Sequence, residues 1–283
     1  MGSKLSVNNH RSDVIGLTYI YPVLSRRAGG LSIGINFNTN NTCNWRCVYC
    51  QVPNLSIGAA PSIDFDLLAK ELRLFLDDVQ HGDFYDRFEV DADKRVIKDI
   101  AIAGNGEPTT LKEFSRAVGL IGQIATEAGV FPASDYVLIT NGSLIHLPRV
   151  QDGLRILNDY HGQIWFKFDS ATEAGRKLIN NSSQSCQAAV ANLLIASQLC
   201  QTKLQTCLFD FAGRGLPSSE KLAYLEVLKQ IKDHGNIRRI MLYTIARPSA
   251  QPEAEQLAKL PEETLETFAN EIRALGLEVS VSF

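Results

Sequence analysis

Residues 31–50 read LSIGINFNTNNTCNWRCVYC, an apolar run followed by three closely spaced cysteines. The run at residues 31–37 is short and rich in β-branched and aromatic side chains, which favours a buried strand. The thiols of Cys43, Cys47 and Cys50 follow it with the spacing C-x3-C-x2-C. The stretch therefore predicts a strand that carries three thiols on the loop at its end.

Three thiolates this close together are the ligands that a four-iron, four-sulfur (4Fe-4S) cluster needs when the protein ligates three of its irons and leaves the fourth open. A zinc-binding nucleic-acid module is an alternative use of clustered cysteines, although structural zinc prefers four protein ligands. The nearest downstream histidine is the distant His81. The other cysteines, at positions 186, 200 and 207, are widely spaced, and we expect them to be ordinary buried thiols.

Outward from this stretch, short apolar runs alternate with longer segments of helical period, the pattern of strand–helix units in a parallel sheet. The predicted strands are residues 31–37, 96–103, 136–140, 164–169, 204–211 and 239–245, with a final strand at 277–283. The predicted helices are residues 64–79, 111–127, 148–159, 183–200, 218–233 and 261–275. The fold class is therefore α/β, with parallel strands and outer helices.

Leucine stripes support two of these helices, every four residues in 64–79 and every three in 218–233, at positions 68, 72, 76, 222, 225 and 228. Residues 81–95 and 247–260 resist assignment. The second of these follows a strand end, so a functional loop and a solvated insertion are both open interpretations. We expect residues 1–30 to be an N-terminal extension and residues 31–283 to form one domain.

Composition sets outer limits on function. The chain has 283 residues, is 45% hydrophobic and 21% charged, and carries a net charge of -3, as expected for a globular protein with an ample core. Its charge gives no general attraction to nucleic acid. No secretory signal and no membrane-length apolar segment is apparent, so we expect a cytoplasmic protein without a membrane partner.

Two further motifs follow predicted strands. Gly104, Asn105, Gly106 and Glu107 come after the second strand, and Asn141 comes after the third. Because the carboxyl ends of parallel barrel strands meet at one mouth, these residues and the cysteines should face one cavity. The glycines would let a ligand approach the backbone, and the carboxylate could accept from an ammonium group. Ordinary turns remain the alternative.

The fourth predicted strand carries two charges. Side chains alternate along a strand, so Trp165, Lys167 and Asp169 share one face while Phe166 and Phe168 share the other. If the phenylalanines meet the helices, the charged residues point into the barrel, where they need partners. A purely structural contact between Lys167 and Asp169 is the competing interpretation.

The cysteine motif, with Tyr49 before its last cysteine, and the Gly-Asn-Gly-Glu-Pro motif together resemble the radical S-adenosylmethionine (radical SAM) enzymes. The resemblance is greatest to the iron-sulfur oxidoreductases related to wyosine tRNA-base synthases. It implies a partial (β/α)6 TIM-like barrel of parallel strands. It also implies cluster ligation by Cys43, Cys47 and Cys50, with the cofactor's amine and carboxylate on the free iron.

The same resemblance implies roles for the other motif residues. Tyr49 would lie near the adenine of S-adenosyl-L-methionine, and Asn141, Lys167 and Asp169 would line its ribose and carboxylate. The methionyl ammonium would be taken by Gly104, Asn105, Gly106 and Glu107.

The implied reaction is reductive cleavage of S-adenosylmethionine to a 5′-deoxyadenosyl radical, which abstracts hydrogen from an unidentified substrate. An external donor such as flavodoxin or ferredoxin would supply the electron. The type of enzyme, oxidoreductase or transferase, stays open. Arg247, at a strand end, is a candidate contact for an anionic substrate group, and a structural arginine that anchors the carbonyls of its loop is the alternative.

Two alternatives within this chemistry concern the substrate. Wyosine-type tRNA base modification would rest on scattered basic residues, Arg26, Arg27, Arg238 and Arg239, yet residues 1–42 contain no cysteine for the second cluster that wyosine synthases carry. A glycyl-radical activase would share the cofactor and act on a protein or peptide.

Overall fold

The computed structural model describes residues 16–25, 29–234, 236–237 and 239–283. Its main sheet has eight strands in the order β1-β2-β5-β6-β7-β8-β10-β12. Their bounds are Ile20–Ser25, Gly30–Ile35, Ile97–Ile102, Asp135–Thr140, Gln163–Lys167, Gln201–Cys207, Arg239–Tyr243 and Glu278–Ser282. All neighbouring pairs are parallel except the antiparallel pair β1 and β2. The sheet does not close on itself, which confirms the predicted partial barrel.

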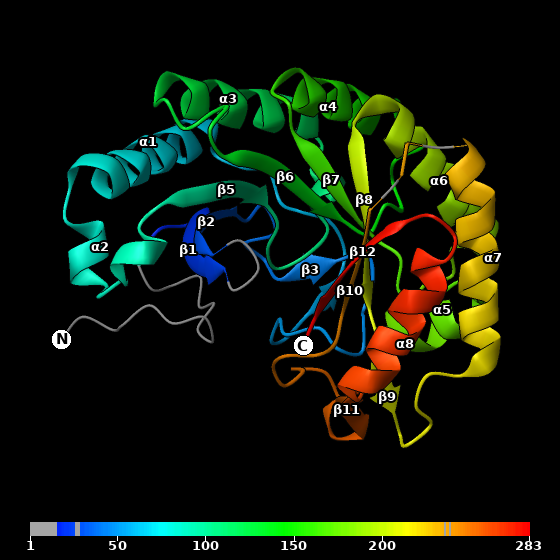
Figure 1. The fold of residues 1–283 in the computed structure, drawn as a ribbon. Coiled ribbons are helices and arrows are strands. Elements are labelled where there is room, and N and C mark those ends of the chain that lie inside the picture. Colours follow the sequence, from blue (N-terminus) through cyan, green and yellow to red (C-terminus); the bar gives the residue numbers. More distant parts are fainter. Residues whose placement is uncertain (1–15, 26–28, 235, 238) are drawn as a thin grey trace.

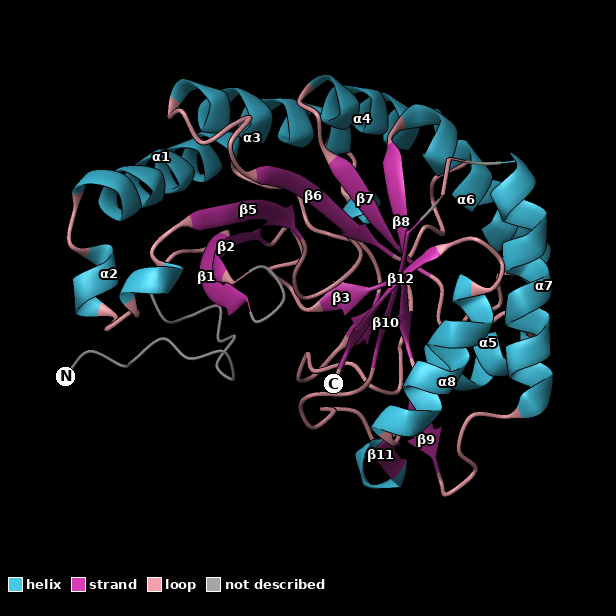
Figure 2. Ribbon diagram, viewed as in Figure 1, coloured by secondary structure: helices cyan, strands magenta, loops and turns pink. Residues whose placement is uncertain are grey.

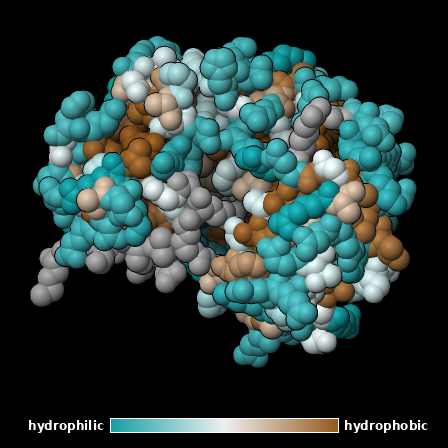
Figure 3. All heavy atoms as spheres, in the orientation of Figure 1, coloured by the Kyte–Doolittle hydropathy of each residue, from teal (hydrophilic) through white to brown (hydrophobic). Residues whose placement is uncertain are grey.

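Helices follow the outer side of this curved sheet. Figures 1 and 2 show them along an arc, with the strands inside it. Neighbours along the arc contact one another, in the sequence α1, α3, α4, α6, α7, α8. Their bounds are Phe65–His81, Phe114–Glu127, Pro148–Asp159, Cys186–Leu199, Ser218–His234 and Glu262–Arg273. In the space-filling view most of this outer layer is hydrophilic (Figure 3). No helix among the described residues is long and apolar enough to span a bilayer.

Local sequence explains how α1 forms and packs. The Asp64 side chain caps the helix by accepting from the backbone N–H groups of Asp66 and Leu67. The predicted stripe of Leu68, Leu72 and Leu76 is buried in the main core. The stripe predicted for α7 is wrong at Leu222, which is 69% exposed. A spacing of three drifts around a helix, and the buried face of α7 is instead Tyr224, Leu228 and Ile231.

Part of the predicted N-terminal extension belongs to the sheet. Residues 20–25 form β1, which pairs along its length with β2, from Ile20 opposite Ile35 to Ser25 opposite Gly30. Residues 1–15 and 26–28 of the extension lie outside the described residues. The hairpin of β1 and β2 therefore begins before residue 31.

The predicted strand at residues 204–211 is two strands. β8 ends at Cys207, and β9 (Phe209–Phe211) pairs with β11 (Leu257–Lys259) in a separate small sheet. The first of these strands ends where its backbone changes hydrogen-bond partner. The Cys207 N–H donates to a side chain, the Asp169 carboxylate oxygen Oδ1, at 2.9 Å. β11 and a 3-10 turn, Ala254–Gln256, lie in the segment 247–260 left unassigned from sequence. The other unassigned segment, 81–95, contains α2 (Phe84–Arg87) and a turn at Ala92–Lys94.

Two small elements stand beside the carboxyl ends of the main strands. β3 (Thr42–Cys43) and β4 (Ser56–Ile57) pair in parallel across the base of the cysteine-bearing loop. α5 (Glu173–Asn180) follows β7 and was not predicted. Its buried residues are polar, Arg176 and Asn180, while Leu178 is exposed, and its eight residues span only about two turns, too few to establish a helical period from sequence.

Candidate functional site

A cavity of about 980 Å³ lies inside the partial barrel and extends to the strands' carboxyl ends. It brings together nearly all the side chains singled out from the sequence. Its lining includes Cys43, Cys47, Tyr49, Cys50, Gly104, Asn105, Gly106, Glu107, Asn141, Trp165, Lys167 and Arg247. Asp169 is the one predicted site residue that is absent from this lining. The expectation that motifs from several strand ends face one cavity thus agrees with the structure.

The three clustered thiols sit on what we call the cysteine loop, residues 38–55, and each is half-buried. The Trp45 N–H approaches Cys43 Sγ at 3.5 Å, and Asn180 Nδ2 donates to Cys47 Sγ at 3.2 Å. Burial raises the pKa of Cys43 and of Cys47 to about 12, and it also raises the pKa of Cys50. A metal that binds these sulfurs would therefore have to displace protons.

The arrangement of the thiols fits a cluster better than a single ion. Among the described residues no three His, Cys, Asp or Glu side chains lie close enough together to hold one metal ion. A structural zinc site usually takes four protein ligands. A 4Fe-4S cluster instead takes one thiolate on each of three separate irons. Three thiols on one cavity wall match the ligand number of the cluster and fall one short of the four ligands usual for structural zinc.

The glycine loop, residues 104–107, packs directly against the cysteine loop. A Cβ atom on Gly106 would lie 1.9 Å from the Thr42 carbonyl oxygen, next to Cys43. A Cβ on Gly104, whose φ is +150°, would lie 2.4 Å from Asn36 Oδ1. These glycines therefore let two loops meet, a role that the sequence interpretation, based on ligand approach, did not include.

The Glu107 carboxylate braces the glycine loop. Oε1 accepts from the Thr109 N–H at 3.1 Å and from the Thr109 and Thr140 hydroxyls at 2.6 Å each. Oε2 accepts from the Asn141 N–H at 2.6 Å. Burial raises the pKa of Glu107, and these donors oppose the shift. Each carboxylate oxygen offers about two acceptor sites, so Oε1 is filled by protein donors while Oε2, which has one donor, keeps one site on this cavity-lining side chain.

Asparagine side chains tie the loops together. Asn36 Oδ1 accepts from the N–H groups of Asn38 and Asn105, at 3.0 and 3.1 Å. Asn105 Nδ2 then donates to Asn41 Oδ1 at 2.7 Å. Asn36, Asn38 and Asn41 were missed from the sequence, where the signal was an asparagine-rich run directly after a strand.

Asn141 links the third strand end to the cysteine loop. Its Nδ2 donates to Asn44 Oδ1 at 2.8 Å, and its Oδ1 accepts from the Ser143 N–H at 3.0 Å. The residue is 6% exposed. Asn141 thus lines the cavity while holding the loop that carries Cys43.

Asp169 lies behind the cavity wall and organises it. Its carboxylate accepts from the Tyr49 hydroxyl, from Asn180 Nδ2 at 2.8 Å and from the Cys207 N–H at 2.9 Å. It is 2% exposed, so it anchors these three groups instead of facing a ligand. The sequence interpretation placed it on the ribose; the structure gives it protein partners.

Lys167 does face the cavity. As predicted from alternation, Phe166 and Phe168 are buried in the main core while Trp165 and Lys167 line the cavity. The ammonium donates to the Tyr243 hydroxyl at 2.9 Å and lies 5.0 Å from the centroid of the Tyr49 ring. Its partner is therefore a tyrosine, and no direct ion pair with Asp169 is formed.

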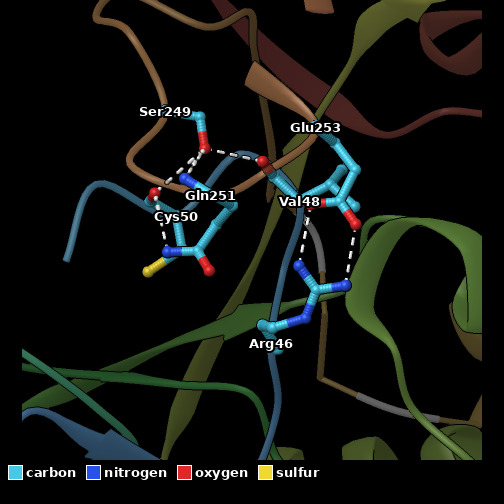
Figure 4. A network of polar contacts seen from close by, with 6 residues as sticks. All are labelled: Arg46, Val48, Cys50, Ser249, Gln251 and Glu253. Atoms are coloured by element: carbon cyan, nitrogen blue, oxygen red, sulfur yellow. Dashed lines mark hydrogen bonds and ion pairs between the residues drawn. The ribbon is translucent and has the colours of Figure 1, made fainter. Parts of the chain in front are cut away.

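A second segment, which we call the clasp (residues 247–256), closes over the cysteine loop. The Ser249 hydroxyl donates to the carbonyl oxygens of Val48 and Cys50, at 2.7 and 3.1 Å. The Ala250 N–H also donates to the Cys50 carbonyl, at 2.9 Å. Figure 4 shows these contacts from Ser249 beside the ion pair of Arg46 with Glu253. The clasp is thus built into the site, which favours the functional interpretation of this unassigned segment.

The remaining basic candidates divide between the two ends of the barrel. Arg247 lines the cavity and donates from Nη1 to Gln51 Oε1 at 3.2 Å. Arg239 begins β10, at the opposite end from the cysteines, and pairs with Glu278 at 2.7 Å. Arg26, Arg27 and Arg238 lie outside the described residues. Of the two described arginines in this group, Arg247 is therefore the one that reaches the site.

No family model matches the chain. A curated relative, described as GTPase Obg of Brachyspira hyodysenteriae, is 29% identical over 155 residues, or 54% of this chain and 19% of that protein. The chain spans about a fifth of that relative's length, which is too little to assign the relative's activity to it.

Solved structures resemble the whole chain. A radical SAM methyltransferase from Sphaerobacter thermophilus has a TM-score of 0.61 at 13% identity, covering 93% of this chain and 68% of that one. TYW1 with a lysine-pyruvate adduct bound has a TM-score of 0.58 at 13% identity, covering 90% and 84%. anSMEcpe with bound AdoMet has a TM-score of 0.55 at 16% identity, covering 88% and 63%. The chain therefore has the fold of the radical SAM enzymes, which confirms, at the level of fold, the resemblance inferred from its motifs.

Proposed function

We propose that this protein is a radical SAM enzyme, with a 4Fe-4S cluster held by Cys43, Cys47 and Cys50 and S-adenosylmethionine bound beside it. The observation that carries the proposal is the meeting of the cysteine loop and the glycine loop on one cavity, with Gly106 against the backbone that precedes Cys43. The likeness in fold to radical SAM enzymes supports it.

When bound, the reduced cluster and cofactor would supply a 5′-deoxyadenosyl radical able to take hydrogen from a substrate. The protein's part is to place and shield the reacting groups. Glu107 fixes the glycine loop so that its backbone can meet the methionyl ammonium. Asp169 holds Tyr49 in place, and Lys167 stays beside the Tyr49 ring, available to an anionic or hydroxyl group.

The reductant and substrate are further parts of the proposal. An external electron donor such as flavodoxin or ferredoxin would reduce the cluster. The substrate would enter the same cavity, and Arg247 at its lining would contact an anionic group. Wyosine-type modification of tRNA is a second candidate, and the likeness in fold to TYW1 favours it. Against it, Arg239, one of the basic residues proposed to contact RNA, lies at the end of the barrel opposite the cysteines.

Anaerobic reconstitution tests the proposal. The protein should bind close to four irons and four sulfides per chain. Under dithionite it should cleave S-adenosylmethionine to 5′-deoxyadenosine. Cys47→Ala should abolish cluster binding while the barrel stays folded, and Cys186→Ala, on α6 outside the cavity, should retain it. Zinc without iron in the purified protein, or equal iron loss in both variants, would overturn the proposal.

A further inference from the structure

The part of the cavity bordered by β1, β2 and β5 contains a carboxylate that the proposed chemistry does not use. Alternation along β5 turns Asp99, Ala101 and Ala103 toward the cavity, while Ile100 and Ile102 are buried in the main core. Asp99 is 6% exposed. A carboxylate therefore sits in the interior wall of the barrel.

Few interactions offset the cost of burying the Asp99 carboxylate. Its Oδ1 accepts from the Ser32 hydroxyl. No hydrogen bond to its Oδ2, and no ion pair with a cation, is formed by the part of the chain that the structure describes. The neighbouring titratable groups are Tyr21 and Asp135, and neither supplies positive charge. A buried carboxylate is costly without a charged or multiple hydrogen-bond partner, so this one is left ready to accept from a ligand.

Beyond Asp99 the cavity is lined by small residues, one of which, Gly34, is covered by the Tyr21 ring. Gly34, Ala101 and Ala103 line the cavity between Asp99 and the glycine loop. A Cβ on Gly34 would lie 2.1 Å from Cζ of Tyr21, so the glycine lets this ring lie across β2. Four residues of strand separate Asp99 from Ala103, which corresponds to about 13 Å. An elongated molecule could thus reach from Asp99 toward the proposed cofactor position.

A second polar group in the same cavity lacks a partner. Trp165 Nε1 is buried and makes no hydrogen bond with the residues described here, and Trp165 lines the cavity wall formed by β7. An indole N–H can only donate. Because the Nε1 atom itself is covered by protein atoms, a ligand would reach it only if the ring moved, so recognition in this cavity depends on Asp99.

We propose that the cavity binds a substrate bearing a protonated amine or amidine, and that Asp99 recognises this cationic group. The inference rests on the proposed function, in that the cavity is taken to be the substrate site. An ammonium group supplies three donors and neutralises the buried charge, which a neutral hydroxyl cannot do. Burial raises the pKa of Asp99 to about 6, so the carboxylate is still ionised at pH 7.5.

Matched small probes test the recognition directly. Anaerobically reconstituted protein is titrated at pH 7.5 with n-hexylamine, 1-hexanol or hexanoate, and dissociation constants are measured by ligand-observed NMR. The amine should bind about tenfold more tightly than the alcohol, because a hydrogen bond to a charged group adds that much. Asp99→Asn should remove most of this preference and leave the alcohol's affinity unchanged. Asp99→Ser, a smaller neutral replacement, should do the same.

Asp135→Asn is the matched control, because Asp135 is an exposed carboxylate at the register position next to Asp99 on β6. It should retain the amine preference. Equal binding of amine and alcohol, tighter binding of hexanoate, or an amine preference that survives both changes at Asp99 would overturn the inference. Iron content and S-adenosylmethionine cleavage, measured on the same preparations, report separately on the proposed function.

Discussion

Arg46 of the cysteine loop and Glu253 of the clasp form a two-point ion pair, with Nη1 and Nη2 each 2.7 Å from a carboxylate oxygen. The two side chains are 29% and 21% exposed, so solvent screens the pair only in part. This contact joins residues 207 positions apart, across the loop that carries Cys47.

Arg46→Met should loosen the clasp. We expect iron to leave the reconstituted protein about two- to tenfold faster in the presence of a chelator, because such a pair contributes on the order of 1 kcal/mol. Arg73→Met is the control, since it breaks the exposed pair of Arg73 with Glu127 between α1 and α3. Equal rates of iron loss in the two variants would show that the clasp does not secure the cysteine loop.

Gly106→Ala should disrupt the contact between the two loops. The added methyl would lie 1.9 Å from the Thr42 carbonyl oxygen, so backbone must move. We expect loss of iron binding with the barrel's circular dichroism unchanged. Gly58→Ala is the control, because its methyl would meet Thr42 Cβ at an ordinary 3.5 Å. A Gly106→Ala protein that binds four irons would contradict the packing described here.

Asn180→Leu should remove two hydrogen bonds at once, to Cys47 Sγ and to Asp169 Oδ2. The buried carboxylate would then lack one donor, at a cost of about 1–3 kcal/mol in the free energy of unfolding. Hydrogen bonds to ligating sulfurs also tune the reduction potential of a cluster. Urea denaturation of the metal-free protein and a redox titration of the reconstituted protein measure the two effects. Asn192→Leu, on α6, removes hydrogen bonds to the carbonyl oxygens of Gly142 and Ser143, so it should share the stability cost and leave the reduction potential unchanged.

Asp99→Asn should make the protein more stable at neutral pH. The folded-state pKa of about 6 lies above the usual 3.8, so as pH rises from 4 to 6 the unfolded chain ionises while the folded protein keeps its proton. Folded wild type therefore loses stability over that window, by on the order of 3 kcal/mol at pH 7. Asparagine does not titrate, so its advantage should grow between pH 4.5 and 7.5 in urea denaturation. A pH-independent difference would contradict the shift.

Sequence patterns anticipated the parallel strands and outer helices because these bury periodic apolar stripes. Leu68 and Leu72 of α1 are examples, both fully buried. They failed where a short helix buries polar residues, as in α5, which has eight residues and buries Arg176 and Asn180. That helix nonetheless supplies the donor to Cys47.

At the candidate site, too, the sequence predicted some features and not others. The motifs predicted which loops meet, since strand ends converge, and the cavity contains Cys47, Gly106 and Lys167 together. They could not predict side-chain partners. Glu107 and Asp169 were expected to face a ligand, yet both carboxylates accept from protein donors. Such pairing depends on long-range contacts that spacing does not encode.

The clasp holds the cysteine loop mainly by its carbonyl oxygens, at Val48, Cys50 and Val52, with Ser249 and Gln251 as the donors. Every residue offers the same carbonyl, so these contacts place no demand on the side chain of Val52, whereas Arg46 and Gln51 contact the clasp through their side chains. A different side chain at position 52, which lines the cavity, would therefore change the polarity around the proposed cluster site while these hydrogen bonds stay the same.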